Sequence, residues 1–270
     1  MTFKFKVAAA AVAFLAIGAA QAQKAPVPDY TLSANVAGVS QYRFRGIEQT
    51  SGAPALQAGV DFAHKNGFYA GLFTSSVTWV RELNGASAGE REIDYFLGYK
   101  TAVSNINLDI GAIQYQFPGN NSGVLGTPGN AAGTTTYTDA NTTEVYVGIS
   151  TGIVSFKLNH ATSNFMGNKN SGGAKYYDLS LNFDLGNGLT FVPHVGYQTV
   201  PNATAGTDTK AGDYTDYALT LNKDFGKGFS ASVATVGTNA NGTFWNANYN
   251  GKTNRYLGGN AAVVGVKYTF

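Results

Sequence analysis

The feature that most constrains this chain is a hydrophobic pattern of period two that recurs along most of its length. Apolar and polar side chains alternate from Tyr176 to Leu185, and again from Ala262 to Phe270. Successive side chains of a β-strand point to opposite faces, so this period indicates strands with one apolar face and one small or polar face. The segments lie near residues 30–44, 54–63, 68–80, 91–100, 106–117, 143–150, 153–164, 175–185, 189–200, 213–223, 229–237 and 260–270.

The connections between these segments alternate between short and long. Short turns alternate with long polar stretches such as 118–142 and 238–259. A transmembrane β-barrel has short periplasmic turns, long extracellular loops, an even number of strands and spans of about 10 residues. The sequence therefore predicts an all-β fold, an antiparallel up-and-down barrel of about 12 strands in an outer membrane. The short turns are His64–Gly67, Thr101–Asn105, Thr151–Gly152, Gly186–Gly188 and Asp224–Gly228.

Composition argues against other classes of protein. Charged residues make up 13% of the chain, against roughly 25% in an average soluble domain. The 34 glycines disfavour a helical bundle, and the absence of cysteine excludes a disulfide scaffold. With 18 basic and 16 acidic side chains, no nucleic-acid partner is indicated. A soluble β-sandwich would also alternate, but it needs no regular change between long and short connections.

The N-terminus has the layout of a secretory signal peptide. Lys4 and Lys6 precede an uncharged run, and Ala20-Gln21-Ala22 supplies a small-x-small cleavage pattern. We therefore predict a cleaved signal peptide at residues 1–22, a barrel at residues 23–270, and export through the general secretory route. No later segment approaches the 18 consecutive apolar residues of a transmembrane helix.

The phase of the pattern assigns side chains to the lipid or to the lumen. We expect Leu179, Leu181, Val264 and Val266 to face lipid, and Asn182, Thr220 and Lys267 to face the lumen.

Two segments depart from the simple pattern. In 106–117 the apolar phase changes, which a bulge near Gly111 would explain. Pro193 lies inside a predicted strand, although a closed barrel has no free edge.

The residues around the first predicted hairpin resemble a known family. The motifs are Tyr42-Arg43-Phe44-Arg45-Gly46-Ile47, Gln49-Thr50, Pro54-Ala55-Leu56-Gln57, Gly67-Phe68-Tyr69-Ala70-Gly71 and Glu92-Ile93-Asp94-Tyr95. They look like the signature of the TorF-type porin family of Gram-negative outer membranes. The specific resemblance covers residues 30–100, and Glu48 stands where that family is expected to have Ser. The resemblance implies an outer-membrane pore and names no substrate.

Residue patterns for catalysis or metal binding are almost absent. His64, His160 and His194 have no metal-ligand spacing, so we expect no metal, no cofactor and no enzymatic activity. The glycines at 186–188 and 226–228 lead into strands, which favours tight turns over phosphate loops. His160 with Thr162 offers the one outward pair for an outer-membrane hydrolase, and we interpret it as two polar residues at the rim.

Charges at the outer ends of the predicted strands are candidates for lining a pore. Arg43 and Arg45 lie at the outer end of the first predicted strand, and we expect Asp178 across the lumen from them. Five carboxylates against two arginines favour a weak cation preference. Ordinary ion pairs at the rim are the alternative. The candidate carboxylates are Glu92, Asp94, Glu144, Asp178 and Asp216.

Together these features predict an outer-membrane channel for passive diffusion of small hydrophilic solutes. Its expected partners are outer-membrane lipid, the solutes themselves, and the barrel-assembly machinery through the C-terminal Phe270. The loop 118–142 is long enough to fold inward and narrow the lumen. The alternatives are a non-conducting barrel with a surface-binding or structural role and an outer-membrane hydrolase.

Overall fold

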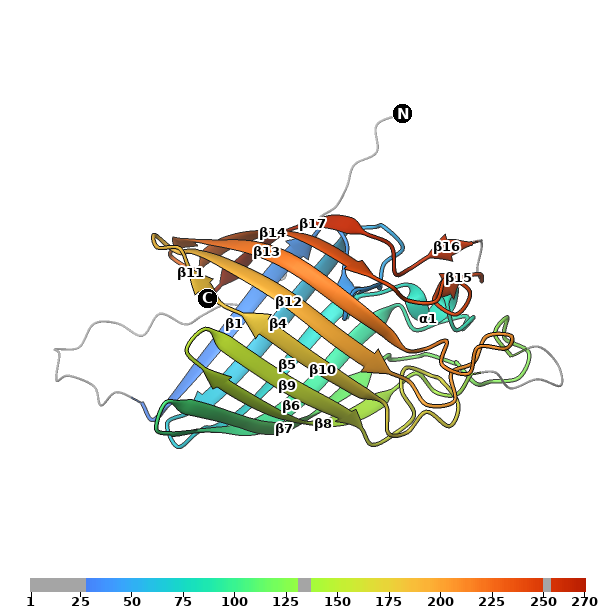
Figure 1. The fold of residues 1–270 in the computed structure, drawn as a ribbon, viewed down its shortest axis with the longest axis horizontal. Coiled ribbons are helices and arrows are strands. Elements are labelled where there is room, and N and C mark those ends of the chain that lie inside the picture. The colour runs from blue at the N-terminus through green and yellow to red at the C-terminus, as the bar shows by residue number, and fades with distance from the viewer. Residues whose placement is uncertain (1–27, 131–136, 250–253) are drawn as a thin grey trace, which may run out of the picture.

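A computed structural model describes residues 28–130, 137–249 and 254–270, so the predicted signal peptide at 1–22 lies outside the described residues. Within them, twelve strands form one antiparallel sheet that closes into a barrel (Figure 1). The ring closes where β10 pairs with β12, and β11 (Phe183–Asp184) continues β10. The strands are β1 (Tyr30–Val39), β4 (Ala55–His64), β5 (Phe68–Ser76), β6 (Arg91–Val103), β7 (Ile106–Gln116), β8 (Thr142–Thr151), β9 (Val154–Ala161), β10 (Lys175–Leu181), β12 (Leu189–Thr199), β13 (Tyr214–Gly226), β14 (Phe229–Thr238) and β17 (Ala261–Thr269).

The connections lie at two different ends of the barrel. Short turns gather at one end, called the short-turn end here, and six long connections gather at the other, the long-loop end (Figure 1). This arrangement confirms the barrel topology that the alternation of connection lengths predicts. The long connections span residues 40–54, 77–90, 117–141, 162–174, 200–213 and 239–260.

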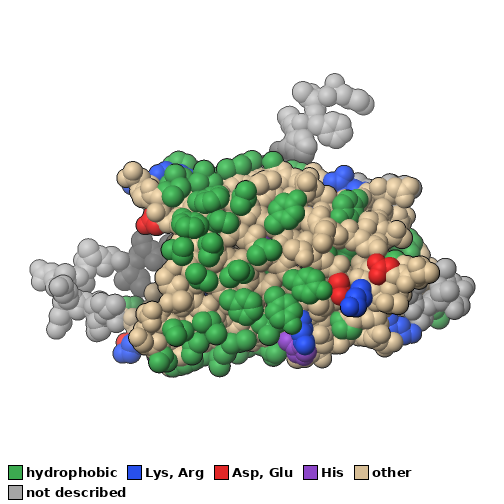
Figure 2. Space-filling view, in the orientation of Figure 1, with side chains coloured by type: hydrophobic (Ala, Val, Ile, Leu, Met, Phe, Trp, Pro, Cys, Tyr) green, Lys and Arg blue, Asp and Glu red, His purple; other side chains and the backbone are tan. Residues whose placement is uncertain are grey.

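The outer face of the barrel is apolar, as a wall in contact with lipid requires (Figure 2). Leu179, Val264 and Val266 are exposed on it, and Leu181 is half-buried. Lys267 lines the lumen, as its phase predicts. The alternation therefore places apolar side chains outside and polar ones inside.

Two predicted strands end early in the structure because the chain turns into the lumen. β1 ends at Val39 instead of residue 44, and β5 ends at Ser76 instead of residue 80. In both cases the chain leaves the wall and turns into the lumen, where the following residues become buried.

The two irregular segments have explanations that the sequence did not supply. The predicted bulge near Gly111 is wrong, because β6 and β7 pair without a register shift from Val103–Ile106 to Ile93–Gln116. Pro193 is accommodated by a break in the neighbouring strand. The ladder between β10 and β12 stops at Ser180–His194 and resumes at Phe183–Phe191, facing the residue that has no N–H to donate.

The core lies inside the long-loop end, not in the middle of the barrel. Each of the six long connections contributes a buried apolar side chain to one cluster, called the plug here. Trp79, in the short helix α1 (Trp79–Glu82), packs edge-on against Phe117 with ring centroids 5.0 Å apart. No helix in the described ranges is long and apolar enough to cross a membrane. One member from each connection is Ile47, Trp79, Phe117, Phe165, Val200 and Trp245.

Candidate functional site

The first long connection, residues 40–54, folds into the barrel and is called the inserted loop here. It forms a small hairpin of β2 (Arg43–Phe44) and β3 (Ile47–Glu48). Arg45 and Gly46 make the two-residue turn, with φ of 48° and 80°. Positive φ at both positions is the mark of the tight turn that matches strand twist, and glycine adopts it without strain. The turn brings the Arg45 side chain to the opposite wall.

Arg45 is held by a bidentate ion pair. Its two terminal nitrogens donate to the two Glu144 oxygens of β8, at 3.0 and 2.6 Å. The same guanidinium donates to Gln198 Oε1 on β12 at 2.9 Å and lies 4.4 Å from the Tyr176 ring centroid. The two ion-pair side chains are 5% and 1% exposed. One loop residue thus joins two strands across the lumen.

The electrostatics of Arg45 follow from this pairing. Burial by itself lowers the pKa of Arg45, but the Glu144 carboxylate outweighs burial and raises that pKa above its ordinary value. The guanidinium therefore stays charged, and a buried charge of this kind requires its partner.

Three further residues anchor the inserted loop. Arg43 donates to the carbonyl oxygens of Leu257 and Gly259, at 3.1 and 3.0 Å, and burial lowers its pKa. Glu48 is 2% exposed and accepts from Arg255 Nη2 at 2.9 Å. Tyr42 donates to Glu92 Oε1 at 3.0 Å. Burial, with the Glu92 carboxylate beside it, raises the pKa of Tyr42 well above its ordinary value, so the hydroxyl stays a donor.

The predicted pore charges fall into separate groups. Arg45 meets Glu144, whereas Glu92 and Asp94 lie buried near Tyr42. Asp178 and Asp216 meet a residue that the prediction left out: His194 places Nε2 at 2.8 Å from Asp216 and Nδ1 at 3.5 Å from Asp178. Arg43, in β2, bonds to loop carbonyls rather than to these carboxylates.

Sequence reasoning missed His194 and Gln198 as members of this network. Both lie on the lumen face of β12, at positions whose spacing follows the period-two pattern. That spacing was the available signal, because a polar residue on an inward face is a candidate for charge recognition. The spacing does not indicate which distant charged residue such a side chain contacts.

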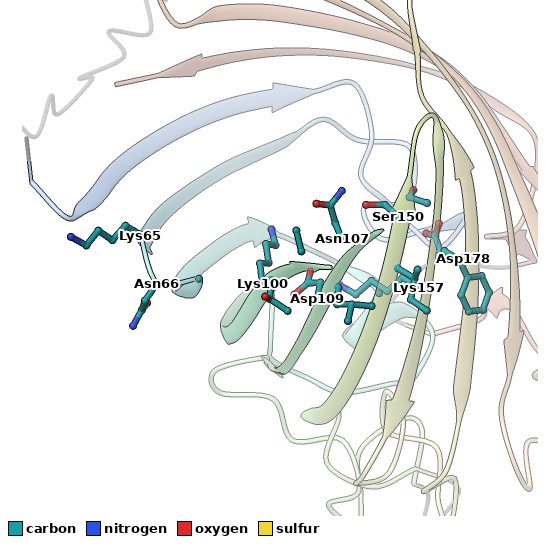
Figure 3. A pocket seen from close by; sticks show the side chains of 16 residues that line it. Lys65, Asn66, Lys100, Asn107, Asp109, Ser150, Lys157 and Asp178 are labelled. Carbon is teal, nitrogen blue, oxygen red and sulfur yellow. The ribbon is translucent and has the colours of Figure 1, made fainter. Parts of the chain in front are cut away.

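Below the inserted loop, a cavity of about 760 Å³ runs from the short-turn end into the lumen. Its wall carries Lys100, Asp109, Lys157 and Asp178, which lie on β6, β7, β9 and β10 (Figure 3). A second cavity of about 790 Å³ is lined largely by small neutral residues, with Lys267 and Asp184 among the exceptions. The short-turn half of the lumen is therefore polar and hollow, while the long-loop half is filled by the plug.

Comparison with known proteins places this barrel in a family. A family described as bacterial protein of unknown function, Gcw_chp, matches residues 22–270. The chain belongs to the Gcw_chp family. A search of curated proteins finds no match.

Solved structures share the fold of this Gcw_chp barrel at low sequence identity. The NanC porin aligns with a TM-score of 0.52 and 12% identity, over 87% of this chain and 98% of that one. The KdgM porin, in complex with disordered oligogalacturonate, aligns with a TM-score of 0.51 and 10% identity, over 88% and 99%. The fold of the Gcw_chp chain is thus that of small outer-membrane porins.

A serine and a histidine lie close together in the Gcw_chp lumen. The described residues hold no group of three or more side chains suited to a metal ion. Ser180 lies 3.3 Å from His194 Nδ1, which resembles part of a hydrolase triad. However, Ser180 donates to Asp178 at 3.0 Å, and a carboxylate faces each nitrogen of the imidazole.

Proposed function

We propose that this protein is an outer-membrane channel for passive diffusion of small hydrophilic solutes. The observation that carries the proposal is the polar cavity of about 760 Å³ inside a closed barrel with an apolar outer wall. The resemblance of residues 30–100 to TorF-type porins and the fold shared with the oligogalacturonate-bound KdgM porin support it. We place the barrel in the outer membrane of a Gram-negative bacterium, with the short-turn end in the periplasm, after export by residues 1–22.

The inserted loop acts in this proposal as the gate at the extracellular end. The plug, to which this loop contributes Ile47, fills that end, so passage requires the loop to withdraw from the lumen. The withdrawn loop keeps Arg43 and Arg45 at the channel mouth, where the five carboxylates of the wall outnumber them, which gives the open channel a weak cation preference. The wall carboxylates are Glu92, Asp94, Glu144, Asp178 and Asp216.

Conductance across a planar bilayer tests the channel proposal. Refolded protein should give single-channel steps, and a variant with residues 43–48 shortened to two glycines should give larger and longer ones. A matched control shortens residues 206–209, an exposed stretch of another long connection. Both variants must keep the gel mobility of a folded barrel. If the correctly folded protein and its loop-shortened variant were both silent, the channel proposal would be overturned.

The plug also favours a second function, a non-conducting barrel with a surface-binding or structural role. In that case the long connections present a fixed extracellular surface, and the same measurements remain silent. Lipid contact and recognition by the barrel-assembly machinery through Phe270 belong to both proposals.

A further inference from the structure

Four charged side chains of the cavity of about 760 Å³ follow one registered row across the wall. Lys100 pairs with Asp109, Asp109 with Gly148, Gly148 with Lys157, and Lys157 with Asp178. Neighbouring strands lie about 4.8 Å apart. From strand to strand around the wall the row therefore presents plus, minus, a gap at Gly148, plus and minus. Figure 3 labels its four charged residues.

The opposite charges of this row form no direct ion pair. In the described part of the chain, neither lysine ammonium has a carboxylate within 4.0 Å. Instead, Lys100 lies 4.7 Å from the Tyr69 ring centroid and Lys157 lies 3.6 Å from the Tyr146 ring centroid. A cation over an aromatic face keeps its charge and its outward N–H donors. Each lysine is thus positioned without being paired.

The acidic members of the row are fixed by other partners. Asp109 accepts from the Tyr69 hydroxyl at 2.5 Å, and that hydroxyl meets the Tyr146 hydroxyl at 2.5 Å. Asp178 accepts from Ser180. A carboxylate has about four acceptor positions, so both acids keep free capacity on the lumen side.

Gly98 and Gly111 keep the cavity open, because they leave room for the Tyr69 and Tyr146 rings to lie flat against the sheet. A Cβ at Gly98 would stand 2.4 Å from the Tyr69 hydroxyl, and one at Gly111 would stand 2.4 Å from the Tyr146 hydroxyl. Any side chain at these positions would push the rings into the lumen. The wall is therefore built to hold the hydroxyls, lysines and carboxylates around one hollow.

We propose that this row binds a small zwitterionic solute, whose carboxylate pairs with Lys157 and whose ammonium group pairs with Asp109. Asp109 and Lys157 flank Gly148 on strands two apart, about 10 Å across the sheet, and they form no direct ion pair, so one compact molecule with two charges can bridge them. A solute with a single charge gains one attraction and meets repulsion from the neighbouring charge of the row. A cavity of about 760 Å³ has the size of a small-molecule site.

The site deepens the proposed channel function and rests on it for its role in transport. Binding is therefore measured without transport, by calorimetric titration of the refolded barrel in detergent. The probes share one three-carbon skeleton: β-alanine carries both charges, propionate only the negative one and propylammonium only the positive one. β-Alanine should bind at least about tenfold more tightly than either singly charged probe.

Substitutions test which residue binds each charged end of the solute. Asp109→Asn and Lys157→Gln should each weaken β-alanine binding about tenfold. The matched controls Asp61→Asn and Lys267→Gln, on strands outside the row, should leave it unchanged. Gly148→Leu keeps every charge, fills the gap and should also weaken binding; its Cβ would meet only ordinary contacts, 3.5 Å from Asp109 Cβ.

The outcomes separate this inference from the channel proposal. Equal binding of propionate and β-alanine, no binding of β-alanine, or equal effects of the row and control variants would overturn the zwitterion site. A protein that conducts without binding β-alanine keeps the channel function and loses the site. A protein that binds β-alanine without conducting keeps the site and loses the channel function.

Discussion

At the scale of single residues, Arg45 connects the inserted loop to two strands of the barrel wall. It occupies a left-handed turn position, and its side chain makes the bidentate contact with Glu144 that ties the inserted loop to the opposite wall. Strain at such a position costs of order 1–3 kcal/mol and persists where surrounding contacts over-determine it. The ion pair and the contact with Gln198 provide those contacts.

Removing one partner of this buried pair should be strongly destabilising. Arg45→Ala leaves the Glu144 carboxylate buried and unpaired, which we expect to lower the free energy of unfolding by about 3–5 kcal/mol. Denaturant unfolding of the refolded barrel measures the effect. The control Lys65→Ala breaks an ion pair with Asp29 whose side chains are 67% and 56% exposed, and should cost about 0–1 kcal/mol. Equal effects of the two variants would contradict the importance of burial here.

A second prediction at the scale of residues concerns the ion preference of the channel. Replacing Arg43 and Arg45 together with Ala removes two positive charges while the wall carboxylates remain, so the reversal potential should shift toward cations. The shift should shrink as salt rises, because the Debye length is about 8–10 Å at moderate salt. Measurement in a salt gradient across a bilayer checks it. An unchanged reversal potential at low salt, with conductance intact, would leave the arginines a structural role only.

At the scale of elements, strand phase decides which side chains meet lipid. Leu219 and Thr220 are neighbours in β13, yet Leu219 is 50% exposed on the outer face while Thr220 is half-buried on the inner one. The outward positions of the neighbouring strands also carry apolar side chains. A register shift of one residue would therefore move every outward side chain of the strand to the lumen and every inward one to the lipid.

This phase predicts opposite outcomes for two adjacent substitutions. Leu219→Arg places a charge in the lipid and should cost about 2–4 kcal/mol near the midplane, which impairs assembly. Thr220→Arg places the same side chain in the polar lumen and should assemble normally. Folded yield in lipid vesicles, read from gel mobility, compares them. Equal assembly of the two variants would show that the assigned phase is wrong.

At the scale of the whole molecule, closure removes every free strand edge. All wall strands pair on both sides around the ring, so unfolding must break the whole hydrogen-bonded cylinder. The plug adds buried apolar contacts at one end. Such a barrel should unfold slowly even in detergent.

We therefore expect the protein to be heat-modifiable and to fractionate with the outer membrane. Unboiled protein in detergent should migrate differently from boiled protein on a gel, because the closed barrel resists unfolding at room temperature. The loop-shortened variant should keep this property, since the wall alone closes the ring. Recovery of the mature protein in the soluble periplasmic fraction would contradict the prediction.

The sequence by itself determined the barrel. Period-two alternation and the order of short and long connections are local properties, because side-chain direction and turn length are set within a few residues. These two patterns predicted the number of strands and which side chains face inward or outward, as at Leu179 and Val266. Strand ends such as Val39 and Ser76 were less well determined, since there the chain leaves the wall for reasons that lie elsewhere in the molecule.

Only the tertiary structure decided what fills the lumen. Arg45 meets Glu144 and Gln198, which are 99 and 153 residues away in the chain, and no local pattern encodes such partners. The change of phase at Ile113 is explained in the same way. Its inward apolar side chain needs no bulge once the inserted loop supplies an apolar surface to pack against. Loop insertion depends on contacts among distant segments, and these form only when the closed ring brings the segments together.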